Sequence, residues 1–215
     1  MHMNAARLNK IEVVQVYSRI AWFYDAWGTL AESRARRRAL ELAGVRNGEA
    51  VLEVAVGTGL TFRELLRANP DGANHGIDLT EAMLARARDK ARQSGARHEL
   101  SVGDAYDLRF ADASFDVLMN NYMFDLLPEP DFERVLTQFR RVLKPNGRLV
   151  LVNMTRGERL HQRLYETIYR INPGWMGGCR GVLLSDALNR VGFRNVTREM
   201  ISQLGFPSEI LTADA

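Results

Sequence analysis

Apolar residues recur along this chain in two patterns, short continuous runs and longer stripes with three- and four-residue steps. Short runs bounded by turn residues are typical of strands buried on both faces, and stripes are typical of amphipathic helices. The runs predict strands over residues 50–56, 74–79, 99–102, 115–120 and 148–153. The stripes between them predict helices over residues 60–69, 80–95 and 131–142, the last one capped by Asp131. This alternation indicates a parallel, doubly wound sheet.

The two ends of the chain depart from the alternation. Apolar spacing predicts two helices within residues 1–44, and after a helix over residues 185–191 two strands are expected over residues 195–203 and 207–212. Only Leu204-Gly205-Phe206 joins these strands. That connection is too short for a parallel crossover, so the last two strands are expected to pair antiparallel.

Length and composition fit one globular domain. The chain has 215 residues, 46% of them hydrophobic and 26% charged, with no internal repeat or linker-like run. We divide it into an N-terminal helical cap segment, residues 1–44, and a main part, residues 45–215. The longest apolar run, around residues 148–152, is far shorter than the roughly 20 residues of a membrane span. With no secretory signal expected and a single cysteine, Cys179, the predicted location is cytoplasmic.

The basic residues are unevenly distributed. The formal net charge is +3, and cations gather within residues 34–38, 86–92 and 140–144. Such clusters are commonly solvated helix faces. Alternatively, they form a surface that meets phosphates, on a lipid headgroup or on nucleic acid.

The most informative motif ends the first predicted strand, where Glu53 precedes the turn Gly57-Thr58-Gly59. Glycine lets the backbone approach a ligand where a Cβ atom would collide, and the turn directs the amides of the next helix toward that ligand. Asp78 ends the second predicted strand. A carboxylate about 20 residues after the turn can accept both hydroxyls of a ribose. The spacing therefore indicates a ligand that contains a nucleoside.

Three later segments make the pattern more specific: Val102-Gly103-Asp104-Ala105, Phe115-Asp116-Val117-Leu118 and the run from Arg141 to Leu149. Together with the first turn they resemble the class I S-adenosylmethionine-dependent methyltransferases over nearly the whole chain. The closest resemblance is to the small-molecule branch that includes ubiquinone/menaquinone C-methyltransferases and bacterial phospholipid N-methyltransferases. It implies a Rossmann-like, seven-stranded, mostly parallel α/β sheet with helices on both faces and an antiparallel C-terminal strand pair. Residues 45–215 would form the S-adenosylmethionine-binding domain.

The resemblance also implies a role for each matching residue, with S-adenosylmethionine as cofactor and S-adenosylhomocysteine as product. The expected cofactor contacts, from the methionine end through the ribose to the adenine, are Glu53, Ala55, Gly57, Thr58, Gly59, Asp78, Leu79, Met83, Asp104 and Ala105. Asn120 is expected beside the transferring methyl group. Family members usually carry glycine where this chain has Ala55, so we expect a slightly repositioned turn that still binds.

Residues outside these motifs supply further candidates. The segment 17–25 is similar to the one that closes over the cofactor in this branch, and Tyr17 and Tyr24 are its candidate contacts, because aromatic rings attract a positive sulfur. Tyr17 is also a candidate catalytic residue. Alternatively, this helix only packs its apolar stripe on the sheet. If the acceptor needs a general base, His161 is the candidate, with a surface histidine as the alternative. No cysteine or histidine spacing suggests a metal site.

The residues after the fourth predicted strand bear on the acceptor. Methylases of adenine or glutamine amines typically carry Asn or Asp, two prolines and an aromatic residue there, whereas this chain reads Asn120-Asn121-Tyr122-Met123. A nucleic-acid partner is therefore disfavoured. A nicotinamide-dependent oxidoreductase is disfavoured too, because its fingerprint has a third glycine where this chain has Phe62.

The sequence therefore predicts methyl transfer to a small or lipid-like acceptor. One candidate is a phospholipid headgroup amine, reached at an anionic membrane that the basic residues 34–38 contact peripherally. A second candidate is C- or O-methylation of a quinone-like small molecule. A third, of another class, is a catalytically silent S-adenosylmethionine-binding protein.

Overall fold

The computed structural model describes residues 32–155, 181–204 and 206–215. In chain order its elements are α2 (Ser33–Ala43), β1 (Ala50–Val54), α3 (Leu60–Ala68), β2 (Ala73–Asp78), α4 (Glu81–Ala91), β3 (His98–Val102), β4 (Phe115–Asn121), η1 (Phe124–Leu126), η2 (Glu129–Asp131), α5 (Phe132–Val142), β5 (Leu143–Met154), α7 (Ser185–Val191), β6 (Arg194–Gln203) and β7 (Phe206–Asp214). Among the described helices, none combines the length and the apolar character that crossing a membrane requires.

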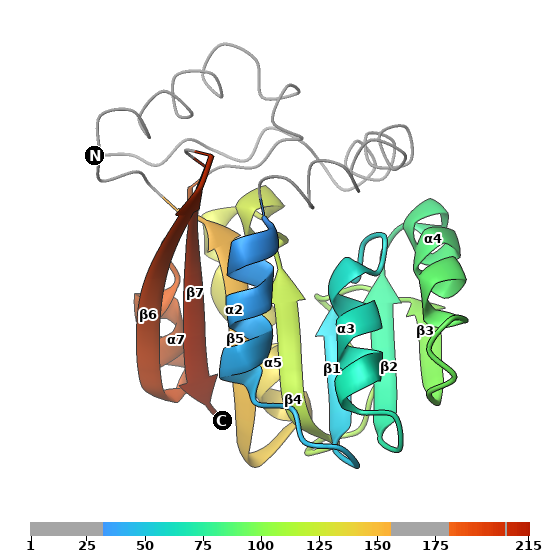
Figure 1. The fold of residues 1–215 in the computed structure, drawn as a ribbon. Helices are drawn as coiled ribbons and strands as arrows, with labels where there is room; N and C mark the ends of the chain where they lie inside the picture. The colour runs from blue at the N-terminus through green and yellow to red at the C-terminus, as the bar shows by residue number, and fades with distance from the viewer. Residues whose placement is uncertain (1–31, 156–180, 205) are drawn as a thin grey trace.

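The described strands form one seven-stranded sheet in the order β3-β2-β1-β4-β5-β7-β6. Neighbouring strands from β3 to β5 are parallel, whereas β7 pairs antiparallel with both β5 and β6. Helices α2, α3 and α4 cover one face of the sheet, and α5 and α7 cover the other (Figure 1). The predicted fold class, including the antiparallel terminal pair, is confirmed. The strand order reverses between β1 and β4, where sheets of this type bind ligands beyond the carboxyl ends of their strands.

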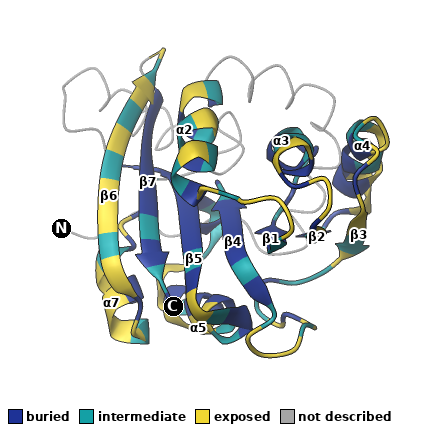
Figure 2. Ribbon diagram, turned by 60° about the horizontal axis from the view of Figure 1, so that its bottom comes forward, coloured by how far each residue is buried: buried dark blue, intermediate teal, exposed yellow. Residues whose placement is uncertain are grey.

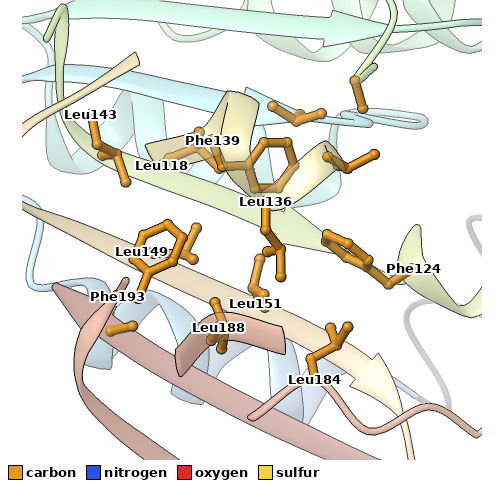
Figure 3. Close-up of a cluster of buried hydrophobic side chains, with 14 of the residues drawn as sticks. Leu118, Phe124, Leu136, Phe139, Leu143, Leu149, Leu151, Leu184, Leu188 and Phe193 are labelled. Carbon is orange, nitrogen blue, oxygen red and sulfur yellow. The ribbon is translucent and has the colours of Figure 1, made fainter. Parts of the chain in front are cut away.

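Each face of the sheet carries its own hydrophobic cluster. The side chains under α5 and α7 include Leu118, Leu136, Phe139, Leu151 and Leu188 (Figure 3), all of them buried. A second cluster lies under α2, α3 and α4. Apolar side chains alternate to the two faces along each central strand, so both faces contribute to stability through burial.

The two edges of the sheet differ from its centre. Strand β6 is exposed or half-exposed along its length, whereas β4, β5 and β7 are mostly buried (Figure 2). Its polar and charged residues fit an edge strand that faces solvent. The carboxyl end of β5 and the start of β7 lie at the edge of the sheet where the switch point opens.

Some local predictions need correction. The helix predicted over residues 80–95 ends at Ala91, and the fifth strand begins at Leu143, before the predicted residue 148. Asn146 adopts a φ of 63° inside this longer strand, and the pairing with β4 shifts register there, so the expected turn is a bulge. The side chain of Asp131 does not cap α5.

The predicted domain division remains a prediction. Residues 1–31, most of the expected cap segment, lie outside the described residues. Helix α2, the described remainder, buries Ala35, Ala39 and Ala43 against the sheet. Small side chains on that face let the helix axis approach the strands closely.

Candidate active site

A cavity of about 480 Å³ lies at the carboxyl ends of the parallel strands, next to the switch point. Its volume falls in the range of small-molecule sites. Its wall comes from the ends of β1, β2, β3 and β4 and from the segment between β4 and α5. The lining residues are Val54, Ala55, Gly57, Asp78, Leu79, Thr80, Met83, Gly103, Asp104, Ala105, Tyr106, Asp107, Asn121, Tyr122, Met123, Leu126, Leu127, Pro128, Asp131 and Arg134.

A second, smaller cavity of about 60 Å³ adjoins the turn after β1. Its lining residues are Glu32, Arg36, Glu53, Ala55, Val56, Gly57, Thr58, Leu60, Thr61, Asn121 and Tyr122. Four residues line both cavities: Ala55, Gly57, Asn121 and Tyr122. We call these four the junction residues.

The turn after β1 places three residues in the left-handed region. Ala55, Gly57 and Gly59 have φ values of 58°, 56° and 83°. A Cβ atom on Gly57 would meet nothing within 4 Å, whereas one on Gly59 would lie 2.8 Å from the Cα of Ala87. Gly59 lines neither cavity, so its glycine serves the close packing of α3 on α4. Its expected contact with the cofactor is not supported by the cavity wall.

Ala55 carries backbone strain at the position where the resemblance expects glycine. A left-handed conformation costs an L-residue roughly 1–2 kcal/mol. The backbone therefore makes the turn that a glycine would make, and the methyl group faces the cavities. The turn is present with its usual sense despite the substitution.

Asp78 organises the floor of the larger cavity. Its carboxylate accepts hydrogen bonds from the backbone amides of Gly57 and Thr80, each at 2.8 Å. Burial raises the pKa of Asp78, and these hydrogen bonds act in the opposite direction. Asp78 thus joins the first turn to the start of α4, in addition to lining the cavity where the ribose is expected.

Glu53 presents an unsatisfied carboxylate oxygen beside the smaller cavity. The side chain is 1% exposed, and its Oε1 accepts a hydrogen bond from Asn121 Nδ2 at 3.2 Å. Among the described residues, its Oε2 has no hydrogen-bond partner. Burial raises the pKa of Glu53 to about 8. A buried acceptor of this kind is satisfied by a ligand that brings a donor, most strongly a cationic one.

The residues expected around the adenine all line the larger cavity. Asp104 and Ala105 follow β3, while Leu79 and Met83 stand at the start of α4. The Oδ1 of Asp104 accepts the amide hydrogen of Tyr106 at 3.0 Å, which holds the loop in place. Apolar walls with one carboxylate suit a purine that offers an amino group.

Asn120 is a correction. It is fully buried, its Nδ2 donates to the carbonyl oxygen of Val54 at 2.8 Å, and it lines neither cavity. The next residue, Asn121, lines both. Successive strand residues point to opposite faces, so a one-residue shift exchanges a wall position for a core position. Two consecutive asparagines gave the sequence no means to distinguish them.

Sequence reasoning missed a group at the rim. The hydroxyl of Tyr106 donates to Asp131 Oδ2 at 2.8 Å, and the guanidinium of Arg134 lies 5.2 Å from the centre of the Tyr106 ring. The carboxylate of Asp131 is therefore engaged by Tyr106 and not by the start of α5. The aromatic residue directly after the Gly103-Asp104-Ala105 segment was the available signal.

Three predicted site residues, Tyr17, Tyr24 and His161, lie outside the described residues, so their roles remain predictions. Thr58 is buried and lines the smaller cavity, as expected for the methionine end. Within the described residues, no group of three or more His, Cys, Asp and Glu side chains could hold a metal ion.

The chain matches the family model described as a methyltransferase domain over residues 51–147. It is 38% identical over 143 residues to a phosphatidylethanolamine N-methyltransferase of Cereibacter sphaeroides, covering 66% of this chain and 67% of that protein. It is 35% identical over 149 residues to a demethylmenaquinone methyltransferase of Thermotoga maritima, covering 67% of this chain and 62% of that protein. The chain therefore spans just over and just under two thirds of these relatives.

Among solved structures, the [4+2]-cyclase SpnF superposes with a TM-score of 0.77 at 19% identity, covering 99% of this chain and 97% of that one. At this identity the likeness shows the fold alone. The family follows from the sequence relatives and from the methyltransferase model. The chain belongs to the S-adenosylmethionine-dependent methyltransferases.

Proposed function

We propose that this protein transfers a methyl group from S-adenosylmethionine to a lipid-like acceptor, with a phospholipid headgroup amine as the first candidate. The observation that carries the proposal is the pair of adjoining cavities at the switch point. The larger one offers apolar walls and two carboxylates, Asp78 and Asp104, for a nucleoside. The smaller one offers the unsatisfied Glu53 Oε2 for an ammonium group.

The residues present fit the cofactor in charge as well as in shape. The methionine end carries an ammonium and a carboxylate, and the smaller cavity is lined by the carboxylates of Glu32 and Glu53 and the guanidinium of Arg36. Arg36 also lowers the pKa of Glu53, against the larger effect of burial. An ammonium hydrogen-bonded to Oε2 would act in the same direction and favour the ionised carboxylate.

When bound, S-adenosylmethionine supplies a methyl group activated by a positive sulfur, with a neutral thioether as leaving group. The chain's part is to bind, orient and exclude water. The buried turn after β1 and the buried end of β4 border the two cavities, so the donor would be held by rigid elements. Positioning alone can lower a barrier by up to roughly 7–11 kcal/mol. For an amine acceptor, the neutral lone pair attacks the methyl carbon while the carbon–sulfur electron pair stays on sulfur.

Two observations favour a lipid surface. Arg34 and Arg37 are exposed on one side of α2, and within the described parts of the chain neither forms an ion pair. The first turn of α2 touches the tip of the β6–β7 hairpin, because Gln203 Oε1 accepts from the amide of Arg34 at 2.8 Å. The exposed Leu204 follows Gln203. An apolar tip beside free cations suits an anionic membrane.

A quinone-like acceptor is the second candidate, favoured by the likeness to demethylmenaquinone methyltransferases. Liposome co-sedimentation separates the two. The variant with Arg34→Glu and Arg37→Glu should lose salt-sensitive binding to anionic vesicles, whereas Arg109→Glu, whose side chain is 91% exposed, should keep it. If wild-type protein ignores anionic vesicles, the headgroup proposal fails and quinones become the first acceptors to assay.

Calorimetric titration with S-adenosylmethionine, S-adenosylhomocysteine and NADH tests the cofactor. We expect micromolar binding of both adenosyl compounds and none of NADH. Ala105→Phe should abolish binding by filling the larger cavity without removing any of the hydrogen bonds of Asp78. Ala111→Phe, an exposed position on the same loop, is the matched control. Absence of binding by wild-type protein would refute the proposal, and binding without turnover of any acceptor would support the silent alternative.

A further inference from the structure

The two cavities meet at a place that has chemical meaning. This argument rests on the proposed function, in which the adenosyl part occupies the larger cavity and the methionine part the smaller one. The sulfur of S-adenosylmethionine joins these two parts. The junction residues, which line both cavities, therefore border the sulfur and its methyl group. Only Asn121 and Tyr122 among them have side chains larger than a methyl group.

Tyr122 is held in an unusual backbone conformation. Its φ of 52° lies in the left-handed region, which is rare for a bulky side chain and marks positions that the surrounding structure constrains. Two contacts from other strands provide the constraint. The amide of Tyr122 donates to the carbonyl of Val152 on β5 at 2.7 Å, and its hydroxyl lies 2.8 Å from Ser208 Oγ on β7.

The phenol is part of a buried arrangement with the terminal hairpin. Tyr122 is 6% exposed and Ser208 is 1% exposed, and the Tyr122 ring lies 5.9 Å from the ring of Phe206. Burial is the main cause that raises the pKa of the Tyr122 phenol well above its usual value. The hydroxyl therefore stays protonated and neutral, and it does not serve as a general base.

We propose that the aromatic ring of Tyr122 borders the sulfonium and that Ser208 of the terminal hairpin fixes the ring in that place. An aromatic ring attracts a positive charge and has little attraction for a neutral thioether. Tyr122 therefore favours the methyl donor over the demethylated product. The antiparallel strand pair thereby takes part in cofactor selection, although β7 itself lines neither cavity.

Calorimetry with the two adenosyl ligands tests this inference. In Tyr122→Leu, S-adenosylmethionine affinity should fall about fivefold to tenfold while S-adenosylhomocysteine affinity changes less than about twofold. Tyr122→Phe keeps the ring and should keep the affinity ratio. Ser208→Ala should shift the ratio in the direction of Tyr122→Leu, by about twofold to threefold. Phe139→Leu, which removes a buried ring far from both cavities, is the control that should change neither affinity.

The outcomes separate this inference from the proposed function. If wild-type protein binds neither ligand, the proposed function fails. If it binds both and Tyr122→Leu weakens them equally, Tyr122 is only a packing residue and the inference is overturned. If Tyr122→Leu does not fold, Tyr122→Met replaces it, since methionine adapts to irregular gaps. An unchanged ratio in both the Met and Ser208→Ala variants would also overturn the inference.

Discussion

The turn after β1 and the end of β4 both place a non-glycine residue in the left-handed region, yet they are held there differently. Ala55 lies in a local turn whose remaining members are glycines and whose hydrogen bonds come from Asp78 and Ile77 nearby. Tyr122 is held by Val152 and Ser208, which are 30 and 86 positions away in sequence. The comparison teaches that one wall of the site is specified locally and the other by the assembled sheet.

The largest expected effect comes from removing the anchor of the first region. Asp78→Ala deletes two hydrogen bonds to a buried carboxylate, so the free energy of unfolding should fall by about 2–4 kcal/mol and cofactor affinity by at least about 100-fold. Urea unfolding and calorimetry measure the two effects. Asp89→Ala, which removes an exposed carboxylate from α4, should change stability by less than about 0.5 kcal/mol. Equal stability of the two variants would contradict the anchoring role.

The second region is broken by removing its long-range partner. Ser208→Ala leaves a buried phenol without the partner it has in the structure, which should lower the free energy of unfolding by about 1–3 kcal/mol. A double-mutant cycle with Tyr122→Phe should give a coupling energy of about 1 kcal/mol. The exposed hydroxyl pair of Thr197 and Thr212 on the same hairpin provides the control cycle, with an expected coupling near zero.

Glu53 connects the two regions through Asn121, and its titration tests that connection. Its pKa in the folded state, about 8, is above the usual glutamate value. The folded state therefore holds the proton more tightly, and this stability is present below about pH 4.5 and lost as the pH rises through about 8. Relative to Glu53→Gln, wild-type protein should lose stability over this window, at no more than about 1.4 kcal/mol per pH unit.

Cofactor binding reports the same group from the other side. An ammonium near Oε2 favours ionised Glu53, so binding near pH 7 should release a proton. Calorimetry in buffers of different ionisation enthalpy measures this release. The Glu53→Gln variant should show none, and proton release of equal size in both proteins would contradict the assignment.

The smallest effect sharpens the comparison within the first turn. Ala55→Gly should stabilise the protein by about 0.5–1 kcal/mol, because it relieves a left-handed alanine. Gly57→Ala should destabilise it by roughly 1–2 kcal/mol, through conformation alone, since a Cβ atom there meets nothing within 4 Å. Chemical unfolding of both variants measures the pair. Destabilisation by Ala55→Gly would show that the Ala55 methyl group contributes more than its strain costs.

Much of the site could be predicted because its motifs are local. The glycine turn, Asp78 and the Asp104-Ala105 pair each follow a strand whose apolar run is visible in the sequence. Parallel strands end at one edge of the sheet, so these segments had to converge there. The choice between Asn120 and Asn121 failed because it depends on how β4 is oriented against β1, which no local pattern records.

The sequence by itself determined the alternation of strands and helices, the antiparallel terminal pair and the cofactor class, because apolar periodicity, loop length and glycine spacing act over a few residues. Only the tertiary structure decided that Gly59 serves helix packing, that Glu53 keeps an unsatisfied oxygen, and that Ser208 reaches Tyr122. These properties depend on burial and on contacts between residues distant in the chain. Such contacts exist only once the strands have assembled into one sheet.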